Sequence, residues 1–193
     1  MLNTKYFIVR GKDGQNEADH NPAALGNAWF VKDYKIVADA DSEIMGLSHF
    51  NAKTTAIVDT RFSNYLNSTR FSYDSTASIK MKSYEPNDLV YTSQAHTEQL
   101  AVFSEIYYDK GWKMLVDGVE KPYFRADYVL RAAQIPAGNH KIEFIFHPAS
   151  YYTGETISLA GSILLLLALG GAGYTGLNKK KEAEEKKPAK KKS

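Results

Sequence analysis

The chain has 193 residues, of which 44% are hydrophobic, 12% are aromatic, 24% are charged and none is cysteine. This length suits one or two domains, and the lack of cysteine excludes a disulfide-stabilised scaffold. The formal net charge of +2 is unevenly spread, because the last 15 residues hold eight lysines and three glutamates. No charged residue lies between Thr156 and Asn178. The sequence therefore divides into a long mixed part, an uncharged segment and a basic end.

Residues 1–155 predict a mainly β fold, an antiparallel β-sandwich with one short helix. Short segments rich in β-branched and aromatic residues are separated by turn signals, which is typical of such folds. The helix is expected around residues 40–50, with Asp41 as its N-cap and Ile44, Leu47 and Ser48 on one face. Residues 61–77 predict a loop with one helical turn at 62–66. The expected strands are 5–10, 28–31, 34–38, 54–59, 78–84, 89–93, 99–106, 113–116, 121–125, 128–134 and 140–146.

The second half of this part has the clearest strand signals. Asp117-Gly118 suits a tight hairpin turn, and residues 136–139 are expected to close the next strand pair. From His140 onward, Ile142, Phe144 and Phe146 alternate with other residues, as in a half-buried strand. These signals predict an antiparallel meander over residues 107–148.

The uncharged segment predicts a transmembrane helix. Thr156 to Leu177 covers 22 residues, and a helix of that length is about 33 Å long, enough to cross a hydrocarbon core of about 30 Å. A buried helix of a soluble protein is the alternative, but such a helix normally has one polar stripe, and residues 163–169 are apolar all round. We therefore expect an outer domain at 1–155, a transmembrane helix at 156–178 and a disordered basic tail at 179–193.

The lysine run also predicts the orientation of the helix. Positive charge favours the cytoplasmic side, so we expect residues 1–155 outside a bacterial cytoplasmic membrane and the tail inside. The N-terminal residues lack the apolar core of a signal peptide. We therefore expect the chain to be the C-terminal piece of a longer membrane protein, with post-translational insertion of the helix as the alternative. Lys179, Lys180 and Lys181 are expected to contact lipid headgroups, although a stop-transfer role explains them equally.

Within the predicted helix, Ala168, Ala172 and Gly176 are spaced by four residues and share one face. Small residues in this arrangement let another transmembrane helix approach closely, so the expected partners are the remaining helices of the parent protein. The alternative is that small residues are simply common in such helices. Residues 171–176 also match the dinucleotide fingerprint G-x-G-x-x-G, but inside a membrane span that motif lacks its strand-to-helix context. We expect no cofactor and no nucleic-acid partner.

One cluster, residues 107–112, is a candidate binding surface. Tyr108, Asp109 and Trp112 could contact a glycan, because flat aromatic rings stack on sugar faces and a carboxylate accepts hydrogen bonds from hydroxyl groups. The alternative is that Tyr107 and Trp112 flank a turn and bury their rings in the sandwich. The five histidines show no spacing typical of metal ligands, so no metal site is expected. No catalytic motif is present.

Several short motifs, taken in their order along the chain, resemble the C-terminal region of the YfhO family of bacterial membrane proteins, especially Bacteroidetes-type sequences. The resemblance implies a parent with many transmembrane helices, distantly similar to membrane glycosyltransferases that use polyprenyl-phosphate sugars. It implies an accessory rather than catalytic role in glycosyl transfer onto envelope glycans. The rival interpretation is a self-contained, membrane-tethered glycan-binding or structural module. The motifs are residues 2–6, 21–30, 84–87, 107–112, 117–118, 131–132 and 136–140, followed by the apolar span.

Overall fold

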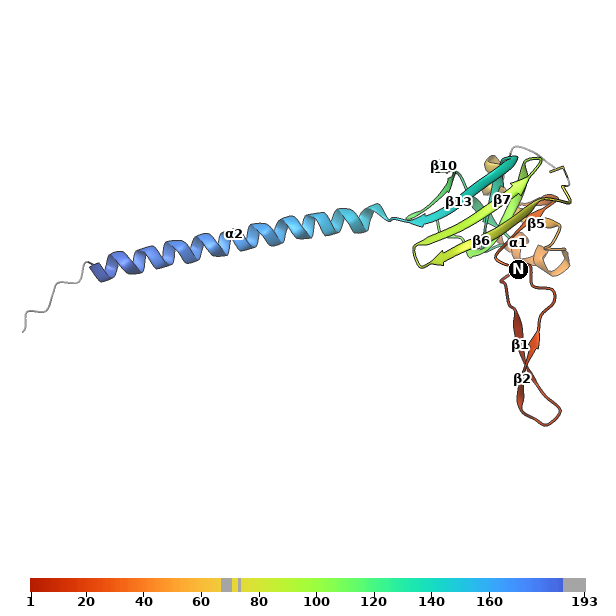
Figure 1. Cartoon of the computed structure of the whole chain (residues 1–193), viewed down its shortest axis with the longest axis horizontal. Coiled ribbons are helices and arrows are strands. Elements are labelled where there is room, and N and C mark those ends of the chain that lie inside the picture. Colours follow the sequence, from red (N-terminus) through yellow and green to blue (C-terminus); the bar gives the residue numbers. More distant parts are fainter. Residues whose placement is uncertain (67–70, 73, 186–193) are drawn as a thin grey trace, which may run out of the picture. The chain divides into compact units, whose positions relative to one another are not determined.

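The computed structural model describes residues 1–66, 71–72 and 74–185, with side chains described as far as Gly176. The chain forms two compact units, Met1–His147 and Pro148–Ser193. The first unit is built mainly from β-strands, and the second contains one long helix (Figure 1). The predicted mainly β fold with a single C-terminal apolar helix is confirmed.

Two antiparallel sheets form the sandwich of the first unit (Figure 1). The five-stranded sheet has the order β10-β9-β13-β7-β6, and the four-stranded sheet has the order β11-β12-β8-β3. The strands of the first sheet are β6 (Ser78–Glu85), β7 (Asp88–Ala95), β9 (Trp112–Val116), β10 (Val119–Lys121) and β13 (Gly138–Phe146). Those of the second are β3 (Ala28–Val31), β8 (Gln99–Ile106), β11 (Phe124–Ala126) and β12 (Leu130–Ile135).

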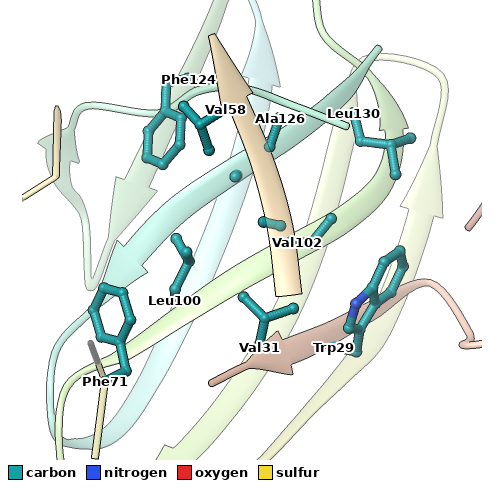
Figure 2. Close-up of a cluster of buried hydrophobic side chains, with 11 residues drawn as sticks. Trp29, Val31, Val58, Phe71, Leu100, Val102, Phe124, Ala126 and Leu130 are labelled. Atoms are coloured by element: carbon teal, nitrogen blue, oxygen red, sulfur yellow. The ribbon is translucent and has the colours of Figure 1, made fainter. Parts of the chain in front are cut away.

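The four-stranded sheet is buried on both faces, because successive side chains of a strand point to opposite sides. On β8, Ala101 and Phe103 join the hydrophobic cluster between the two sheets. Leu100 and Val102 join a second cluster, which packs the other face of this sheet against β5 (Thr55–Asp59). Figure 2 shows this second cluster, with Val58 of β5 above Val102 and Leu100. The sandwich thus carries a third layer, which the sequence did not predict.

The third layer is a β-α-β unit. Strands β4 (Asp33–Val37) and β5 pair in parallel, and helix α1 (Ala40–Gly46) lies between them in the chain, followed by the 3₁₀-helix η1 (Leu47–His49). The helix is where the sequence predicts it, but Asp41 as its N-cap is wrong. Asp39 is the cap, because its backbone is extended and its Oδ1 accepts a hydrogen bond from the Ser42 N–H at 2.8 Å. The expected turn at 62–66 lies in η2, Thr60–Tyr65.

The predicted meander over residues 107–148 is wrong. Strands β9 and β10 form a hairpin, as do β11 and β12, but the two hairpins belong to different sheets. The expected single strand at 121–125 is therefore two strands, and Pro122, which has no N–H to donate, lies where the chain crosses over. Likewise, residues 136–137 connect the sheets, because β12 pairs with β8 whereas β13 pairs with β7 and β9. Of the three alternating positions predicted, Ile142 and Phe144 are buried and Phe146 is half-buried.

A β-hairpin of β1 (Tyr6–Arg10) and β2 (Asn16–His20) extends away from the sandwich (Figure 1). All ten residues of the pair are exposed, including Phe7, Ile8 and Val9. Strand β2 was missed in the sequence because Asn-Glu-Ala-Asp-His has neither apolar alternation nor β-branched residues. It is defined only by its pairing with β1.

The second unit is helix α2, Ala149–Glu185, which therefore begins before Thr156 and continues beyond residue 178. Its segment Ala149–Gly176 is long and apolar enough to cross a membrane, and none of the most apolar window is buried within the structure. Residues 186–193 of the predicted disordered tail lie outside the described residues.

Candidate functional site

The predicted aromatic cluster lies at one end of the sandwich. Tyr108 and Asp109 belong to the loop between β8 and β9, and Trp112 is the first residue of β9. Tyr123, which precedes β11, holds this loop, because its hydroxyl donates a hydrogen bond to the Tyr108 carbonyl at 2.8 Å. The ring of Tyr107 packs 5.6 Å from that of Tyr123. Tyr123 thus anchors the loop by this hydrogen bond, and Tyr107 anchors it by packing its ring against that of Tyr123.

Burial affects the titration of both anchoring tyrosines. It raises the pKa of Tyr107, and it raises the pKa of Tyr123 to about 12. Both hydroxyls therefore stay protonated at neutral pH. The hydroxyl of Tyr123 remains a hydrogen-bond donor to the loop throughout this range.

Tyr108 and Asp109 are exposed, whereas Trp112 is half-buried. The Trp112 ring lies 4.2 Å from the guanidinium carbon of Arg131 and 5.2 Å from the ring of Phe146. These contacts are those of a packed side chain and include a cation–π interaction. Tyr108 and Asp109 can still offer a ring and a carboxylate to a ligand from solvent. The glycan contact of the three residues stays a prediction.

Arg131 is the unexpected member of this end of the sandwich. It lies on β12 and is only 3% exposed. Its Nε donates to the Ile106 carbonyl at 3.0 Å, but within the described part of the chain its Nη1 has no hydrogen-bond partner. Burial lowers the pKa of Arg131 and raises that of Glu105, which interacts electrostatically with it. The pairing of β8 and β12 is irregular next to Arg131, a distortion that can re-aim side chains near functional sites.

A second polar cluster joins the third layer to the sandwich. Glu43 of α1 is fully buried, and its Oε2 lies 2.7 Å from Nη2 of Arg125 on β11. The same Nη2 lies 3.5 Å from Oδ2 of buried Asp59, at the end of β5. Hydrogen bonds from Arg61 hold the pKa of Asp59 below its ordinary value, so this carboxylate is ionised at neutral pH. The buried carboxylates are therefore compensated by two arginines.

Asp127 completes this cluster in the turn between β11 and β12. Asp127 and Tyr128 both have positive φ, at 50° and 71°, a conformation that is unusual for a bulky residue. Two contacts maintain it: the Tyr128 N–H donates to Glu43 Oε1 at 2.9 Å, and the Ile57 N–H donates to Asp127 Oδ1 at 2.8 Å. Burial raises the pKa of Asp127 to about 7. Its Oδ2 has no hydrogen-bond partner among the described residues.

An aromatic contact connects the two clusters. The guanidinium carbon of Arg125 lies 5.5 Å from the Phe62 ring, which lies 5.7 Å from the Tyr107 ring. The Glu43 cluster could not be predicted from the sequence, because an acidic residue in a short helix normally faces solvent. The only available signal was Asp127, since aspartate tolerates positive φ in turns.

The remaining predicted residues belong to α2. Ala168, Ala172 and Gly176 are exposed on the isolated helix, and their packing against another helix stays a prediction. For Lys179, Lys180 and Lys181 the structure describes the helical backbone alone, so their contact with headgroups also stays a prediction. Among residues 1–66, 71–72 and 74–185, no group of three or more His, Asp or Glu side chains is placed to hold a metal ion.

Comparison with known proteins identifies a family of membrane proteins. Residues 48–158, which are more than half of the chain, match the family described as bacterial membrane protein YfhO. No curated protein and no solved structure matches the chain. The matched range includes the strands of both sheets from β6 onward but not β3. It also includes the aromatic loop, Arg125, Asp127 and the start of α2. The chain therefore belongs to the YfhO family of bacterial membrane proteins.

Proposed function

We propose that this chain is the extracytoplasmic β-sandwich and last transmembrane helix of a longer YfhO-type protein of the bacterial cytoplasmic membrane, and that it assists glycosyl transfer onto envelope glycans without catalysing it. In this proposal the basic end of α2 is cytoplasmic. The parent is an enzyme only if its other segments supply the catalytic residues. The rival is a self-contained, membrane-tethered glycan-binding or structural module.

The observation that carries the glycan role is the anchored aromatic loop. Tyr108 and Asp109 place an exposed ring and an exposed carboxylate next to each other in the sequence, and the Tyr123 hydroxyl holds the loop backbone there by donating a hydrogen bond to the Tyr108 carbonyl. A loop that is already ordered loses little conformational entropy when it binds a ligand. Trp112, the residue at which the loop ends, is itself held by its contact with Arg131.

A glycan assay on the parent protein in its membrane tests this role. We expect Tyr108→Ala and Asp109→Asn each to lower binding of polyprenyl-phosphate sugar or envelope glycan, or transfer between them, by about tenfold, which corresponds to about 1.4 kcal/mol. Lys110→Ala, a neighbouring exposed position in the same loop, is the matched control and should leave both unchanged. Wild-type binding and transfer in both variants would contradict the proposal. Glycan binding by the 193-residue chain alone in a nanodisc would favour the self-contained module.

The helix face formed by Ala168, Ala172 and Gly176 is proposed to pack against other helices of the parent. Ala172→Ile enlarges a position on this face and should weaken that packing, because close approach requires small residues. Leu167→Ile, which lies away from the face on a helical wheel, is the control. Cross-linking between α2 and the upstream helices measures the effect, and equal cross-linking in both variants would count against this face.

A further inference from the structure

The β1–β2 hairpin carries a row of apolar side chains that nothing in the described part of the chain covers. Tyr6, Phe7, Ile8 and Val9 are consecutive on β1 and are 61%, 49%, 79% and 42% exposed. The hairpin stands clear of the sandwich, and its sheet has only two strands (Figure 1). An isolated two-stranded hairpin is marginally stable in water, and a third strand is normally needed. Both edges of the hairpin are therefore open to another strand.

The hairpin is nevertheless held in one register. At its tip the Gly11 N–H donates to the Gln15 carbonyl at 2.7 Å, and at its base the Asn21 N–H donates to the Lys5 carbonyl at 2.8 Å. Hydrogen-bonded pairs alternate along an antiparallel ladder, so the odd-numbered residues of β1 bond to β2. The even-numbered residues direct their backbone N–H and C=O groups to the free edge of β1.

This free edge lacks the protection that edge strands usually carry. Its backbone groups belong to Tyr6, Ile8 and Arg10. Edge strands are commonly protected by a proline, a bulge or a charged side chain. Strand β1 has no proline, pairs with β2 without a register shift and carries a charge only at its last residue, Arg10. The edge is thus suited to pairing with another chain.

We propose that β1 pairs antiparallel with β1 of a second copy of this chain, centred on Ile8, so that the two hairpins form one sheet of the order β2-β1-β1-β2. In this register Ile8 of one copy faces Ile8 of the other, and the backbone groups of the free edge bond to each other. Tyr6 faces Arg10, an arrangement that suits a cation–π contact. Phe7 faces Val9 in a non-hydrogen-bonded pair, in which side chains pack most closely.

Charge favours this pairing over the two others that the hairpin allows. Strand β2 carries Glu17 and Asp19, and pairing of β2 with a second β2, centred on Ala18, brings these carboxylates opposite each other, which is destabilising. Pairing of β1 with the other copy's β2 leaves a free edge at each end, so that chains would add without limit. The β1–β1 pairing sets no like charges opposite each other and closes as a dimer.

The proposal concerns the hairpin alone. It requires no glycan and no particular position of the sandwich relative to α2. It can therefore fail while the proposed glycan role stands, and the reverse.

Cysteine cross-linking tests the register, because the sequence contains no cysteine. Phe7→Cys and Val9→Cys chains with different tags are purified in detergent, mixed and treated with a mild oxidant. In the proposed pair these positions face each other at a Cα distance of about 4.5 Å, within the range of a disulfide. In either variant alone the two cysteines lie on a diagonal, about 7 to 8 Å apart. The mixture should therefore form a disulfide-linked dimer at least about fivefold faster than either variant alone.

Glu17→Cys mixed with Asp19→Cys is the matched control. Both positions are exposed on the same hairpin, but in the proposed sheet the two β2 strands lie three strand spacings apart, about 14 Å. The control mixture should therefore cross-link no faster than its single variants. Cross-linking of the control mixture at the rate of the Phe7→Cys and Val9→Cys mixture would overturn the proposal, as would equal rates for that mixture and its single variants.

Two proline variants test the pairing by its affinity. Ile8→Pro removes an N–H from the free edge of β1 and leaves the hydrogen bonds between β1 and β2 in place. Ala18→Pro does the same on the free edge of β2 and is the matched control, because Ala18 pairs with Ile8.

The dissociation constant of the dimer is measured by light scattering of the 193-residue chain in detergent. Ile8→Pro should raise it about tenfold, because each copy loses a hydrogen bond to the other, and Ala18→Pro should leave it unchanged. A monomeric wild type would overturn the proposal. So would a dimer that Ile8→Pro leaves intact, since α2 or another surface would then form the contact.

Discussion

Glu43 and Arg125 form an ion pair of 2.7 Å in which the carboxylate is completely buried. They come from α1 and β11, 82 residues apart in the chain. The pair ties the third layer to the edge of the four-stranded sheet, and Glu43 also accepts the N–H of Tyr128 in its positive-φ turn. One side chain thus serves both as a charge partner and as a support for the turn.

Removal of this carboxylate should be costly. Glu43→Ala leaves the Arg125 guanidinium with only the more distant Asp59, and breaking a buried pair commonly costs about 3 to 5 kcal/mol. We expect a loss of about 3 kcal/mol in the free energy of unfolding, measured by denaturant titration of the chain in detergent. Asp41→Ala, an exposed acidic position of the same helix, should cost no more than about 0.5 kcal/mol. A loss below 1 kcal/mol for Glu43→Ala would show that the pair contributes little.

Asp127 should make the stability of the first unit fall as pH rises. Its folded-state pKa of about 7 lies above the ordinary value of 3.8, so its contribution is complete below about pH 4 and is lost as pH rises toward 7. The expected slope is on the order of 1 kcal/mol per pH unit between pH 5 and 7. Asp127→Asn keeps the acceptor for the Ile57 N–H and should flatten this slope, with thermal unfolding across pH as the measurement.

Wild type and Asp127→Asn must be compared directly, because His140 also makes the free energy of unfolding depend on pH in this range. A hydrogen bond with Asp117 raises the pKa of His140, so its stabilisation is present below pH 6.5 and is lost at higher pH. That contribution is the same in wild type and Asp127→Asn and cancels in the difference. Asp109→Asn, at an exposed position, should leave the slope unchanged. An unaltered slope in Asp127→Asn would contradict the assignment.

Trp112→Ala separates support of the loop from contact with a ligand. The substitution removes a half-buried ring that packs on Arg131 and Phe146, and we expect it to lower the free energy of unfolding by about 3 kcal/mol. Asp109→Asn should change it by no more than about 0.5 kcal/mol. The melting temperatures of both variants give the comparison. If both fold as wild type and both abolish sugar binding, Trp112 is a ligand contact rather than a support.

The orientation of α2 is testable by protease protection. Spheroplasts that express the chain with its natural upstream region are treated with protease, with a tag placed after Ser193. We expect residues 1–147 to be digested and the tag to be spared, because the lysine-rich end favours the cytoplasm. Detergent-permeabilised spheroplasts are the control, in which the tag should be cut. Cleavage of the tag in intact spheroplasts would reverse the proposed orientation.

The parts of the fold that could be predicted are those with a local signal. Strands β3 and β8 match their predicted bounds, because β-branched and aromatic residues there are flanked by polar turns. The pairing of strands could not be predicted, since β12 and β13 are consecutive in the chain but enter different sheets. Which sheet a strand joins depends on which of its faces is buried, and β12 is buried on both faces.

The residues of the candidate site that could be predicted are likewise those with a local signal. Tyr108, Asp109 and Trp112 were found because they are close in sequence, and aromatic residues beside a carboxylate form a recognisable pattern. Arg131 and Glu43 were missed because their partners lie far away in the chain, at Trp112 and Arg125. A buried charge is defined by what surrounds it, and neither residue carries a local sign of its burial.

The double burial of the four-stranded sheet bears on how the first unit exchanges its amide protons. Strand β8 contributes to both hydrophobic clusters through alternate residues, so neither core can open without disturbing it. Protons of such a central strand exchange only when the whole unit opens. The β8 amides should therefore exchange last and report the global free energy of unfolding, whereas those of the exposed β1–β2 hairpin should exchange within seconds to minutes through local fraying.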